Sequence, residues 1–501
     1  MESTWLDRAI GWASPQAGLR RLRNRAALTV TLSYDAAKTG RRTDGWITGG
    51  TSANAEVSAA RQAVRQRSRD LIRNNPIAKN AKFQFASKLA GTGIMPRANT
   101  GKPALDKRIN ELWRIFDNTG NADGPGTVCS MQYGWAGAMF ESGDVFIRRR
   151  NRRPIDGLLI PLQIQTLEAD HLDTSRQRSD ASGYVIDGIE FDRLGKRSGY
   201  WMWKQHPGEN TLIPKQFESA LVSADQIAHL FDGENGRPGQ ISGMPSLAAV
   251  VRKMKDLDDL DEAKLYARKI EACFAVFVRQ ASSENGPLLG SSETDTDGRR
   301  IESLEPGMIE YLRPEEDISF ADPKPSPGYT EEAKHWLHMI AAGTQIPYEL
   351  LTGDLSQVNY SSYRGSLLSF KDHIESMRWN CFIPRALQIV WEWFIDACFM
   401  AGLINEQNYG VEWDAPAFDL LDRLEEAKAD LAEIRCGTLT WPQAIGKKGY
   451  DPEKQAQEIA AANTRLDDLG IILDCDPRQR TAQGNIPSGG GQNESSAAPK
   501  A

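Results

Sequence analysis

The residues that could do catalytic chemistry do not gather into a recognisable motif in this chain. ATP hydrolysis needs a glycine-rich loop whose backbone N–H groups cradle phosphate and which ends in Lys and Ser/Thr. The closest glycine clusters, 120–126 and 446–449, lack that spacing or the hydroxyl. No GxSxG turn presents a serine nucleophile. The sequence therefore predicts no catalytic residue, and we expect a protein that is not an enzyme.

Metal-binding patterns are equally weak. Asp295-Thr296-Asp297-Gly298 resembles part of a calcium loop, but the bidentate glutamate should come six residues after the glycine, where Leu304 stands. His335 and His338 are three residues apart on a predicted helix, so they could chelate an ion, although one surface and one packing histidine fits the spacing better. We expect neither a metal nor a cofactor.

Composition predicts a folded chain with an uneven charge. Of 501 residues, 40% are hydrophobic and 25% charged, which is typical of globular proteins. Six scattered cysteines suggest no disulfide framework. A net charge of -7 argues against a protein that coats DNA with a basic surface. Residues 1–82 carry fifteen Lys/Arg against six Asp/Glu and residues 405–476 seven against sixteen, which indicates either ends that face different neighbours or solvated faces.

The amino-terminal half predicts an arm, two helices and a β-rich region. Residues 1–55 mix arginines with Gly, Ser and Thr and show little helical period. Residues 55–89 are helical in pattern, with a break at Asn74-Asn75-Pro76. Between Val128 and Phe231 the β-type runs are separated by Gly and Pro turns, so we expect strands there. These runs are 144–148, 162–167, 184–186 and 199–203.

The carboxyl-terminal half predicts long helices around a turn-rich insert. Pro245 to Gln280 contains no internal Pro or Gly and reads as one helix. Residues 282–330 are rich in turns, and a second helix follows from Glu331 to Ala342. From Ser361 an apolar stripe at three- and four-residue spacing predicts a helix that Pro384 should bend. A helical group is expected at 425–434, 441–447 and 452–469, and then a disordered tail.

No segment is expected to cross a membrane or to direct export. The most apolar stretch, Cys381 to Leu403, is interrupted by charged residues and has Pro384 near its start. A spanning helix needs about 20 apolar residues with few charges, so we expect a buried helix instead.

Ordered phrases along the chain resemble the lambda-type family of phage portal proteins. Arg69 to Ala78 and Gly91-Thr92-Gly93-Ile94 resemble the family's amino-terminal signature, and Gly143 to Arg148 resembles its central part. Further matching phrases are 34–37, 167–170, 188–190, 229–231, 237–240 and 243–245. The most telling phrase runs from Ile340 to Asp354, followed by Asn359 to Ser362. The pattern departs from the family after Asp422.

The resemblance implies an α+β portal fold with a wing, stem, clip, channel helix and crown. It divides the chain into consecutive regions. These are an extended basic arm 1–55, a wing 56–243 (helices and then β-rich), a first stem helix 244–281, a clip 282–330, a second stem helix 331–344, a tunnel loop 345–360, a channel helix 361–404 kinked near 384, an acidic helical crown 405–476 and a disordered tail 477–501.

The function that the resemblance implies is a ring-forming subunit, a dodecamer in this family, at one capsid vertex. Its channel serves genome packaging and ejection of double-stranded DNA, which passes non-specifically. Implied partners are the terminase large subunit, a later head-completion or tail adaptor protein, and the major capsid and scaffold proteins. The implied location is the virion, with assembly in the host cytoplasm.

Three groups of residues are candidates for these contacts. A polar tunnel loop suits weak contact with sliding DNA better than a basic groove does, and Arg364, Lys371 and Arg378 share one helical face at seven-residue spacing. That cationic stripe faces DNA, a neighbouring subunit or only solvent. The tunnel-loop candidates are Gln345, Gln357, Asn359, Tyr360, Ser361 and Ser362, and the clip candidates for partner docking are Glu315, Glu316, Asp317 and Lys324.

Two other classes of function remain as alternatives. A terminase-like ATPase or a nuclease would act on the same DNA, but it needs a P-loop or a metal-binding carboxylate cluster. A capsid shell or scaffold protein would form shells or elongated coils, whereas a portal forms closed rings.

Overall fold

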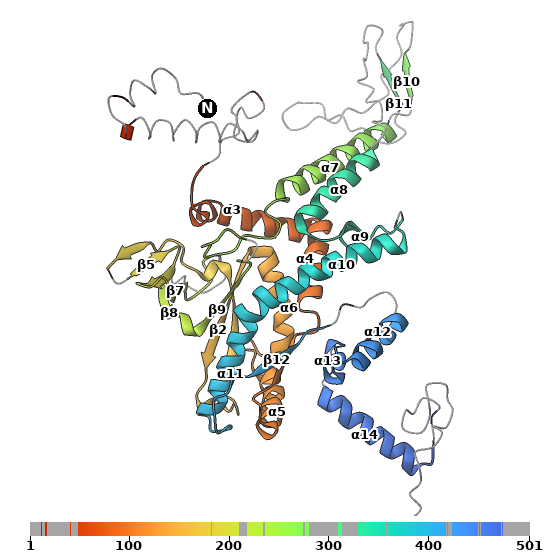
Figure 1. The fold of residues 1–501 in the computed structure, drawn as a ribbon. Helices are drawn as coiled ribbons and strands as arrows, with labels where there is room; N and C mark the ends of the chain where they lie inside the picture. The colour runs from red at the N-terminus through yellow and green to blue at the C-terminus, as the bar shows by residue number, and fades with distance from the viewer. Residues whose placement is uncertain are drawn as a thin grey trace, which may run out of the picture. The chain divides into compact units, whose positions relative to one another are not determined.

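The structure is a computed structural model that describes most of the chain between residues 49 and 471. It covers 49–273 except 182, 210–217 and 234–235, then 276–279, 309–312 and 329–471 except 357, 417, 419–422, 449 and 451, with residues 12, 16, 17, 41 and 473. The chain divides into two compact units, Met1–Ala55 and Glu56–Ala501. The second unit mixes helices and strands, which confirms the predicted mixed class (Figure 1).

Two helices begin the described chain, and they break where the sequence predicts. Helix α3 spans Ala53–Asn74 and α4 spans Pro76–Leu89. Asn75 lies between them with an extended backbone, and its side chain accepts a hydrogen bond from the Ala78 N–H at the start of α4. Pro76 at the first position needs no hydrogen-bond acceptor, so the break satisfies the helix end.

Two further helices precede the strands, α5 (Pro103–Thr119) and α6 (Val128–Ser142). Helix α6 packs against both α4 and α5. The sequence prediction of β structure beginning at Val128 is therefore wrong over α6. This helix is buried on several sides, so its sequence shows no amphipathic stripe of period 3.6. Its local signal is the capping box, in which Thr127 and Ser130 bond each other's backbone N–H groups.

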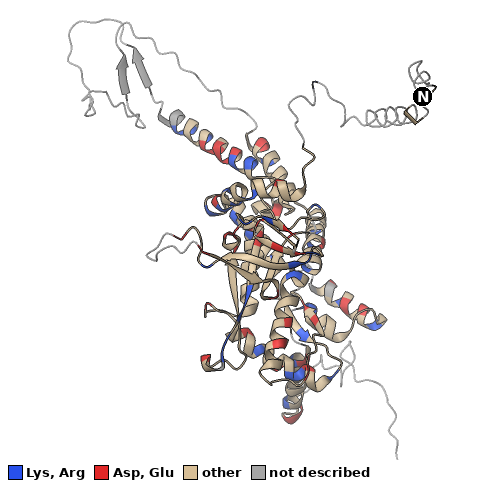
Figure 2. Ribbon diagram, turned by 90° about the vertical axis from the view of Figure 1, so that its left-hand side faces the viewer, with Lys and Arg blue, Asp and Glu red and all other residues tan. Residues whose placement is uncertain are grey.

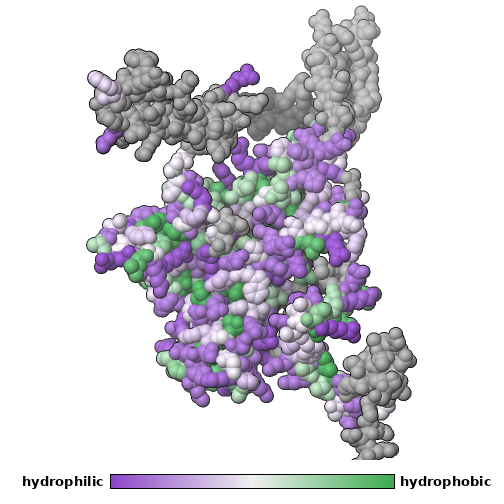
Figure 3. Space-filling model, in the orientation of Figure 1, coloured by the Kyte–Doolittle hydropathy of each residue, from purple (hydrophilic) through white to green (hydrophobic). Residues whose placement is uncertain are grey.

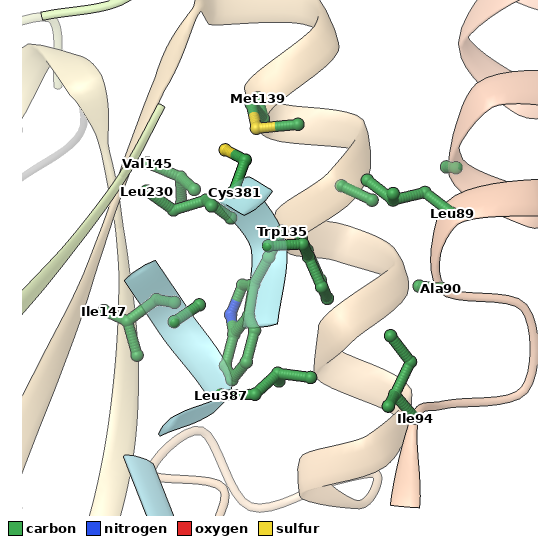
Figure 4. Packing of buried hydrophobic residues seen from close by; sticks show 14 of the residues in the cluster. Leu89, Ala90, Ile94, Trp135, Met139, Val145, Ile147, Leu230, Cys381 and Leu387 are labelled. Carbon is green, nitrogen blue, oxygen red and sulfur yellow. The ribbon is translucent and has the colours of Figure 1, made fainter. Parts of the chain in front are cut away.

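A three-stranded antiparallel sheet has the order β3-β2-β9, with β2 at Asp144–Asn151, β3 at Leu162–Glu168 and β9 at Ile227–Phe231. One face packs on α6, where Trp135 is fully buried and donates a hydrogen bond to Thr166 Oγ1 at 2.7 Å. Figure 4 shows Trp135 projecting from α6 toward the helical segment that carries Leu387. Trp135 belongs to the larger hydrophobic core.

A five-stranded antiparallel meander covers the other face of that sheet. Its strands, in spatial and sequence order, are β4 (Arg178–Asp180), β5 (Gly183–Ile186), β6 (Ile189–Asp192), β7 (Arg197–Trp203) and β8 (Ser219–Ser223). Phe146 from β2 meets Tyr200 from β7 edge-on, with ring centroids 5.7 Å apart, in a second hydrophobic core. The strands predicted from the β-type runs at 144–148, 162–167, 184–186 and 199–203 are confirmed.

Helices α7 (Val251–Cys273) and α8 (Tyr329–Thr344) lie side by side (Figure 1). The predicted helix Pro245–Gln280 is wrong at both ends. The Ser246 N–H donates a hydrogen bond to the Phe140 carbonyl, which attaches the turns before α7 to α6. Helix α7 therefore begins later than predicted, at Val251. Val276–Arg279 is strand β10, which pairs in parallel with β11 (Ile309–Leu312), as its β-branched and aromatic residues favour. Acidic and basic residues are both spread along α7 (Figure 2).

The short helix α9 (Tyr348–Thr352) is followed by three consecutive helical segments, which we call the helical rod. It consists of α10 (Tyr360–Met377), a π-helix (Arg378–Leu387) and α11 (Gln388–Met400). The sequence predicted a bend at Pro384, and the structure has this π-helix there. Proline lacks the N–H that an α-helix requires, and the wider π turns carry the chain past it, as the Gln388 N–H bonding to Ile383 shows.

The remaining described elements of the second unit are a pair of strands and three helices. Strand β12 (Val411–Asp414) pairs antiparallel with β1 (Met95–Ala98). Helices α12 (Arg423–Cys436), α13 (Trp441–Lys447) and α14 (Pro452–Asp468) lie where the sequence predicts them. Among the described residues no helix is long and apolar enough to cross a membrane. The face in Figure 3 is largely hydrophilic with scattered hydrophobic residues.

Helix α3 turns arginines, not apolar residues, toward the sheets. Arg61, Arg65 and Arg69 stand four residues apart, so they share one face of the helix. We call these three residues the arginine ladder. Arg61 pairs with Asp187 at 3.2 Å, Arg65 with Asp144 at 3.1 Å and Arg69 with Asp170 at 2.5 Å. Asp144 lies on β2, Asp170 in the 3₁₀ turn after β3, and Asp187 in the turn between β5 and β6. The ladder therefore attaches α3 to both sheets.

Asp144 is the most enclosed carboxylate of the ladder. It accepts hydrogen bonds from Arg65, His229 Nε2, Ser242 Oγ and the Gly243 N–H, at 2.7 to 3.1 Å. Burial alone would raise the pKa of Asp144, but the hydrogen bond from His229 and the charge of Arg65 lower it to about 2. Burial lowers the pKa of His229 to about 4, and Arg197 donates to its Nδ1. At neutral pH the histidine is therefore uncharged and its Nε2–H points at Asp144.

Asp144→Asn should destabilise the fold strongly. The change leaves Arg65 buried without its carboxylate, which costs about 3–5 kcal/mol of unfolding free energy. Asp156→Asn is the matched control, because Asp156 pairs with the exposed Arg153 and should change stability by less than about 1 kcal/mol. Urea unfolding followed by circular dichroism measures both. Equal stability of the two variants would contradict this account of the ladder.

Stability should also fall in mild acid because of His229. An unfolded histidine takes up a proton near pH 6.5, whereas folded His229 resists until about pH 4, so the unfolded state binds more protons in that window. The free energy of unfolding should therefore decline from pH 6.5 to pH 4, by on the order of 3 kcal/mol. Urea titrations across this range test it, and His229→Gln should flatten the slope. An unchanged slope in that variant would remove His229 as the cause.

Candidate functional site

The segment predicted as a tunnel loop, 345–360, is partly helical. Gln345 follows α8 directly with a left-handed backbone, φ 59°, and its side chain is exposed. Helix α9 then occupies Tyr348–Thr352 and ends at Gly353. Asn359 caps α10 by accepting from the Ser362 N–H at 2.8 Å. The loop is thus shorter than predicted, and Tyr360, Ser361 and Ser362 form the first turn of a helix.

Contacts from α4 and α8 hold this segment in place. Asn80 on α4 donates its side-chain amide to the carbonyls of Leu350 and Leu351, both at 2.8 Å, which satisfies two acceptors at the end of α9. Leu351 is fully buried. After the helix, Asp354 accepts a hydrogen bond from the Tyr348 hydroxyl at 3.2 Å. Lys334 on α8 lies 4.0 Å from the same carboxylate.

The exposed turn at the start of α10 is polar and uncharged. Tyr360 is 55% exposed, and Asn359, Ser361 and Ser362 are also exposed. The first turn of α10 contains no acidic residue. A ligand passing this turn would meet hydroxyl and amide groups, which form hydrogen bonds without a fixed ion pair.

An open hollow of about 520 Å³ lies beside the segment, between α8, α9 and α10. His338 stacks on Tyr348, with ring centroids 4.2 Å apart, at one side of it. His373 lines it from α10, and burial lowers the pKa of His373 against the raising effect of Asp232. Its floor includes Phe370, which is 2% exposed. The hollow brings Gln345 near α10, but no other predicted site residue lines it.

The structure separates the three residues of the predicted cationic stripe, and the prediction is wrong for Arg378. Arg364 is exposed on α10, and Lys371 lies 3.6 Å from Glu375. Arg378 is only 4% exposed, because it begins the π-helix and turns inward. Burial lowers its pKa to about 10.

Arg378 instead binds backbone carbonyls. Its guanidinium donates to Lys88 at 2.5 Å, Leu89 at 2.8 Å and Pro416 at 3.0 Å. Two of these carbonyls end helix α4, where a cation is favourable. Arg378 therefore fastens the helical rod to α4 and to the chain after β12. Seven-residue spacing suggested a shared face, but the change to π geometry and the inward packing were not visible in the sequence.

Other candidates fall outside the described residues or are brought together only by the fold. Glu315, Glu316, Asp317, Lys324 and Gln357 lie outside the described residues. Among those described, Glu168, Asp170 and His206 place ligand atoms within 4.8 Å of one another.

The Glu168, Asp170 and His206 group could not be predicted from the sequence, because its members come from β3, a 3₁₀ turn and the chain after β7. Arg69 already provides a cation, at 3.2 Å from Glu168 and 2.5 Å from Asp170. The arrangement therefore has a structural explanation as the end of the arginine ladder.

Comparison with known proteins gives a consistent result. Residues 39–378 match the family described as Phage portal protein, lambda family. A probable portal protein of Halomonas phage phiHAP-1 is 23% identical over 463 residues, covering 88% of this chain and 88% of that protein. The portal protein of Escherichia phage N15 and portal protein B of Escherichia phage lambda are 23% and 22% identical over 320 residues, covering 56% of this chain and 57% of each relative.

Solved structures give a weaker likeness. A chain in the virion of a native gene transfer agent particle is 13% identical with a TM-score of 0.39, covering 82% of this chain and 95% of that one. A chain in the neck of the native particle, computed with C12 symmetry, is 15% identical with a TM-score of 0.39, covering 76% and 91%.

Arg378→Met should destabilise the protein although the residue was a candidate for ligand contact. The change removes the donors to three carbonyls, so we expect a loss of about 3 kcal/mol in the free energy of unfolding. Arg364→Met removes the same charge from an exposed position of α10 and should cost less than about 0.5 kcal/mol. Urea unfolding of both variants decides, and an Arg378→Met protein as stable as the wild type would contradict the proposed role.

Proposed function

The chain belongs to the lambda family of phage portal proteins, and from that premise we propose that its copies form a closed ring, a dodecamer, around a channel for double-stranded DNA. This proposal rests on the family match over residues 39–378. The matched residues include the β region and helices α7, α8, α9 and α10. A portal protein is a virion component at the portal vertex. Assembly of the ring in the host cytoplasm is part of the proposal.

The regions of the chain receive roles within this ring. Residues 56–243 are the wing, 244–281 and 331–344 the stem, 361–404 the channel helix and 405–476 the crown. We assign the clip to 282–330, most of which lies outside the described residues. The clip would dock the terminase large subunit during packaging and later a head-completion or tail adaptor, and the wing would face the capsid and scaffold proteins.

The segment 345–362 is proposed to line the channel. Its exposed side chains at Asn359, Tyr360, Ser361 and Ser362 are uncharged. Sliding DNA requires contacts that break easily, and hydrogen bonds to neutral groups retain phosphates less than ion pairs do. The anchoring of α9 by Asn80 supports the same proposal, because a channel wall must keep its position while DNA moves. Arg364 would be the nearest cation to such a DNA.

An imaging experiment tests the ring and the lining together. Ser361→Cys in a Cys436→Ser background removes the exposed native thiol that the structure describes and places one label site on the segment. Electron microscopy of the protein labelled with a maleimide–gold cluster should show rings with gold at the central hole. The Cys436→Ser protein alone is the control and should remain unlabelled at the centre.

The outcomes separate the two parts of the proposal. Rings with gold at the rim would overturn the lining role while leaving the ring intact. Monomers, shells or filaments in place of rings would overturn the ring itself.

A further inference from the structure

The end of strand β2 carries five arginines within six residues. They are Arg148, Arg149, Arg150, Arg152 and Arg153, with Asn151 between them. Side chains alternate between the two faces of a strand. Arg149 therefore points to the α11 side, where it lies 3.5 Å from Asp396, while Arg148 and Arg150 share the opposite face. The two faces of one strand thus differ in whether their cations have a counter-charge.

Arg148 and Arg150 have no hydrogen-bond or ion-pair partner among the described residues. In the strand register Gln165 stands opposite Arg148 and Gln163 opposite Arg150. Gln163 is already engaged, since it accepts from Arg152 at 2.8 Å and donates to the carbonyls of Thr119 and Asn121. Gln165 has no such partner in the described structure. We call Arg148, Arg150 and Gln165 the arginine face.

The arginine face is electrostatically unbalanced. Burial lowers the pKa of Arg148, and the charge of Arg150 lowers it further. The Arg148 Nε–H is buried without an acceptor. Like charges on neighbouring positions of one sheet face repel each other. A buried donor that lacks an acceptor is also unfavourable. The repulsion between the two cations falls when an oxyanion accepts from both guanidinium groups.

Nearby carboxylates do not supply that anion. The position next to Arg148 across β9 is Ile227, and the preceding 3₁₀ turn, Ala224–Gln226, contains Asp225. Asp225 is exposed and forms no ion pair with either arginine. By contrast, each arginine of the ladder on α3 has a carboxylate within 3.2 Å. The arginine face is therefore complementary to an anion from outside the subunit.

We propose that the arginine face binds backbone phosphates of double-stranded DNA at a place on the wing separate from the channel segment 345–362. Guanidinium groups match phosphate oxygens in a bidentate manner. Two residues along a strand are about 6.6–6.8 Å apart, so Arg148 and Arg150 can contact separate phosphates, with Gln165 donating between them. The choice of DNA as the polyanion rests on the proposed function. A carboxylate-bearing surface of a second copy is the rival occupant.

The test compares DNA binding by two variants that lose the same charge. Arg148→Gln with Arg150→Gln removes the arginine face, and Arg108→Gln with Arg237→Gln removes two exposed arginines that pair locally with Glu111 and Glu56. The full-length proteins are titrated against a fluorescent 30-base-pair duplex over a range of NaCl concentrations. Circular dichroism and elution volume report that fold and assembly are retained.

The expected result is a change in salt dependence specific to the arginine face. Loss of two phosphate contacts should reduce the slope of log affinity against log salt by about 1.8, because each contact contributes about 0.9. The control variant should keep the wild-type slope. Equal slopes in all three proteins, or no duplex binding by the wild type, would overturn the proposal.

Two further readouts separate the alternatives. An arginine-face variant that binds DNA normally but assembles poorly would assign the face to carboxylates of a second copy and would overturn the DNA assignment. Ring imaging reports on the proposed function without using DNA. Normal rings together with unchanged DNA slopes would therefore reject the arginine face while leaving the portal function in place.

Discussion

The buried carboxylate of Asp144 is the contact on which the arrangement of the described unit depends. Its donors come from α3, from β9 and from the chain that leads into α7. Gly143 and Gly243 make that meeting possible, because a Cβ atom on Gly243 would lie 2.1 Å from the Gly143 carbonyl. A charge enclosed at this depth is stable only when its donors are all present. Helix α3, the three-stranded sheet and the chain that leads into α7 are therefore fixed together.

Helix α4 provides the second common support. Its Asn80 holds the end of α9, and its terminal carbonyls receive Arg378 from the π-helix. The proposed channel segment and the helical rod are thus attached to the same helix, although they are far from it in sequence. The support is polar, so its strength comes from satisfied donors and acceptors more than from apolar area.

The sequence predicted those elements whose signals are local. The break at Asn75-Pro76, the helix at Trp441–Lys447 and the main strands follow from capping residues, proline and alternation, which act within a few residues. Helix α6 was missed because burial on several sides removes the amphipathic period. Helix α7 was extended too far because the contact that delays its start, Ser246 with Phe140, joins residues far apart in the chain.

By itself the sequence determined the family, the mixed fold class and the polar character of the segment Asn359–Ser362, since these depend on residue type and order. The tertiary structure alone decided which charges are free. Arg378 was predicted to lie in an exposed cationic stripe and is enclosed, as are Arg61 and Arg65 of the ladder, whereas Arg148 and Arg150 lie in a strand and have no counter-charge among the described residues. The physical reason is that the state of a charge depends on distance to its partners and on burial, and only the folded chain sets both.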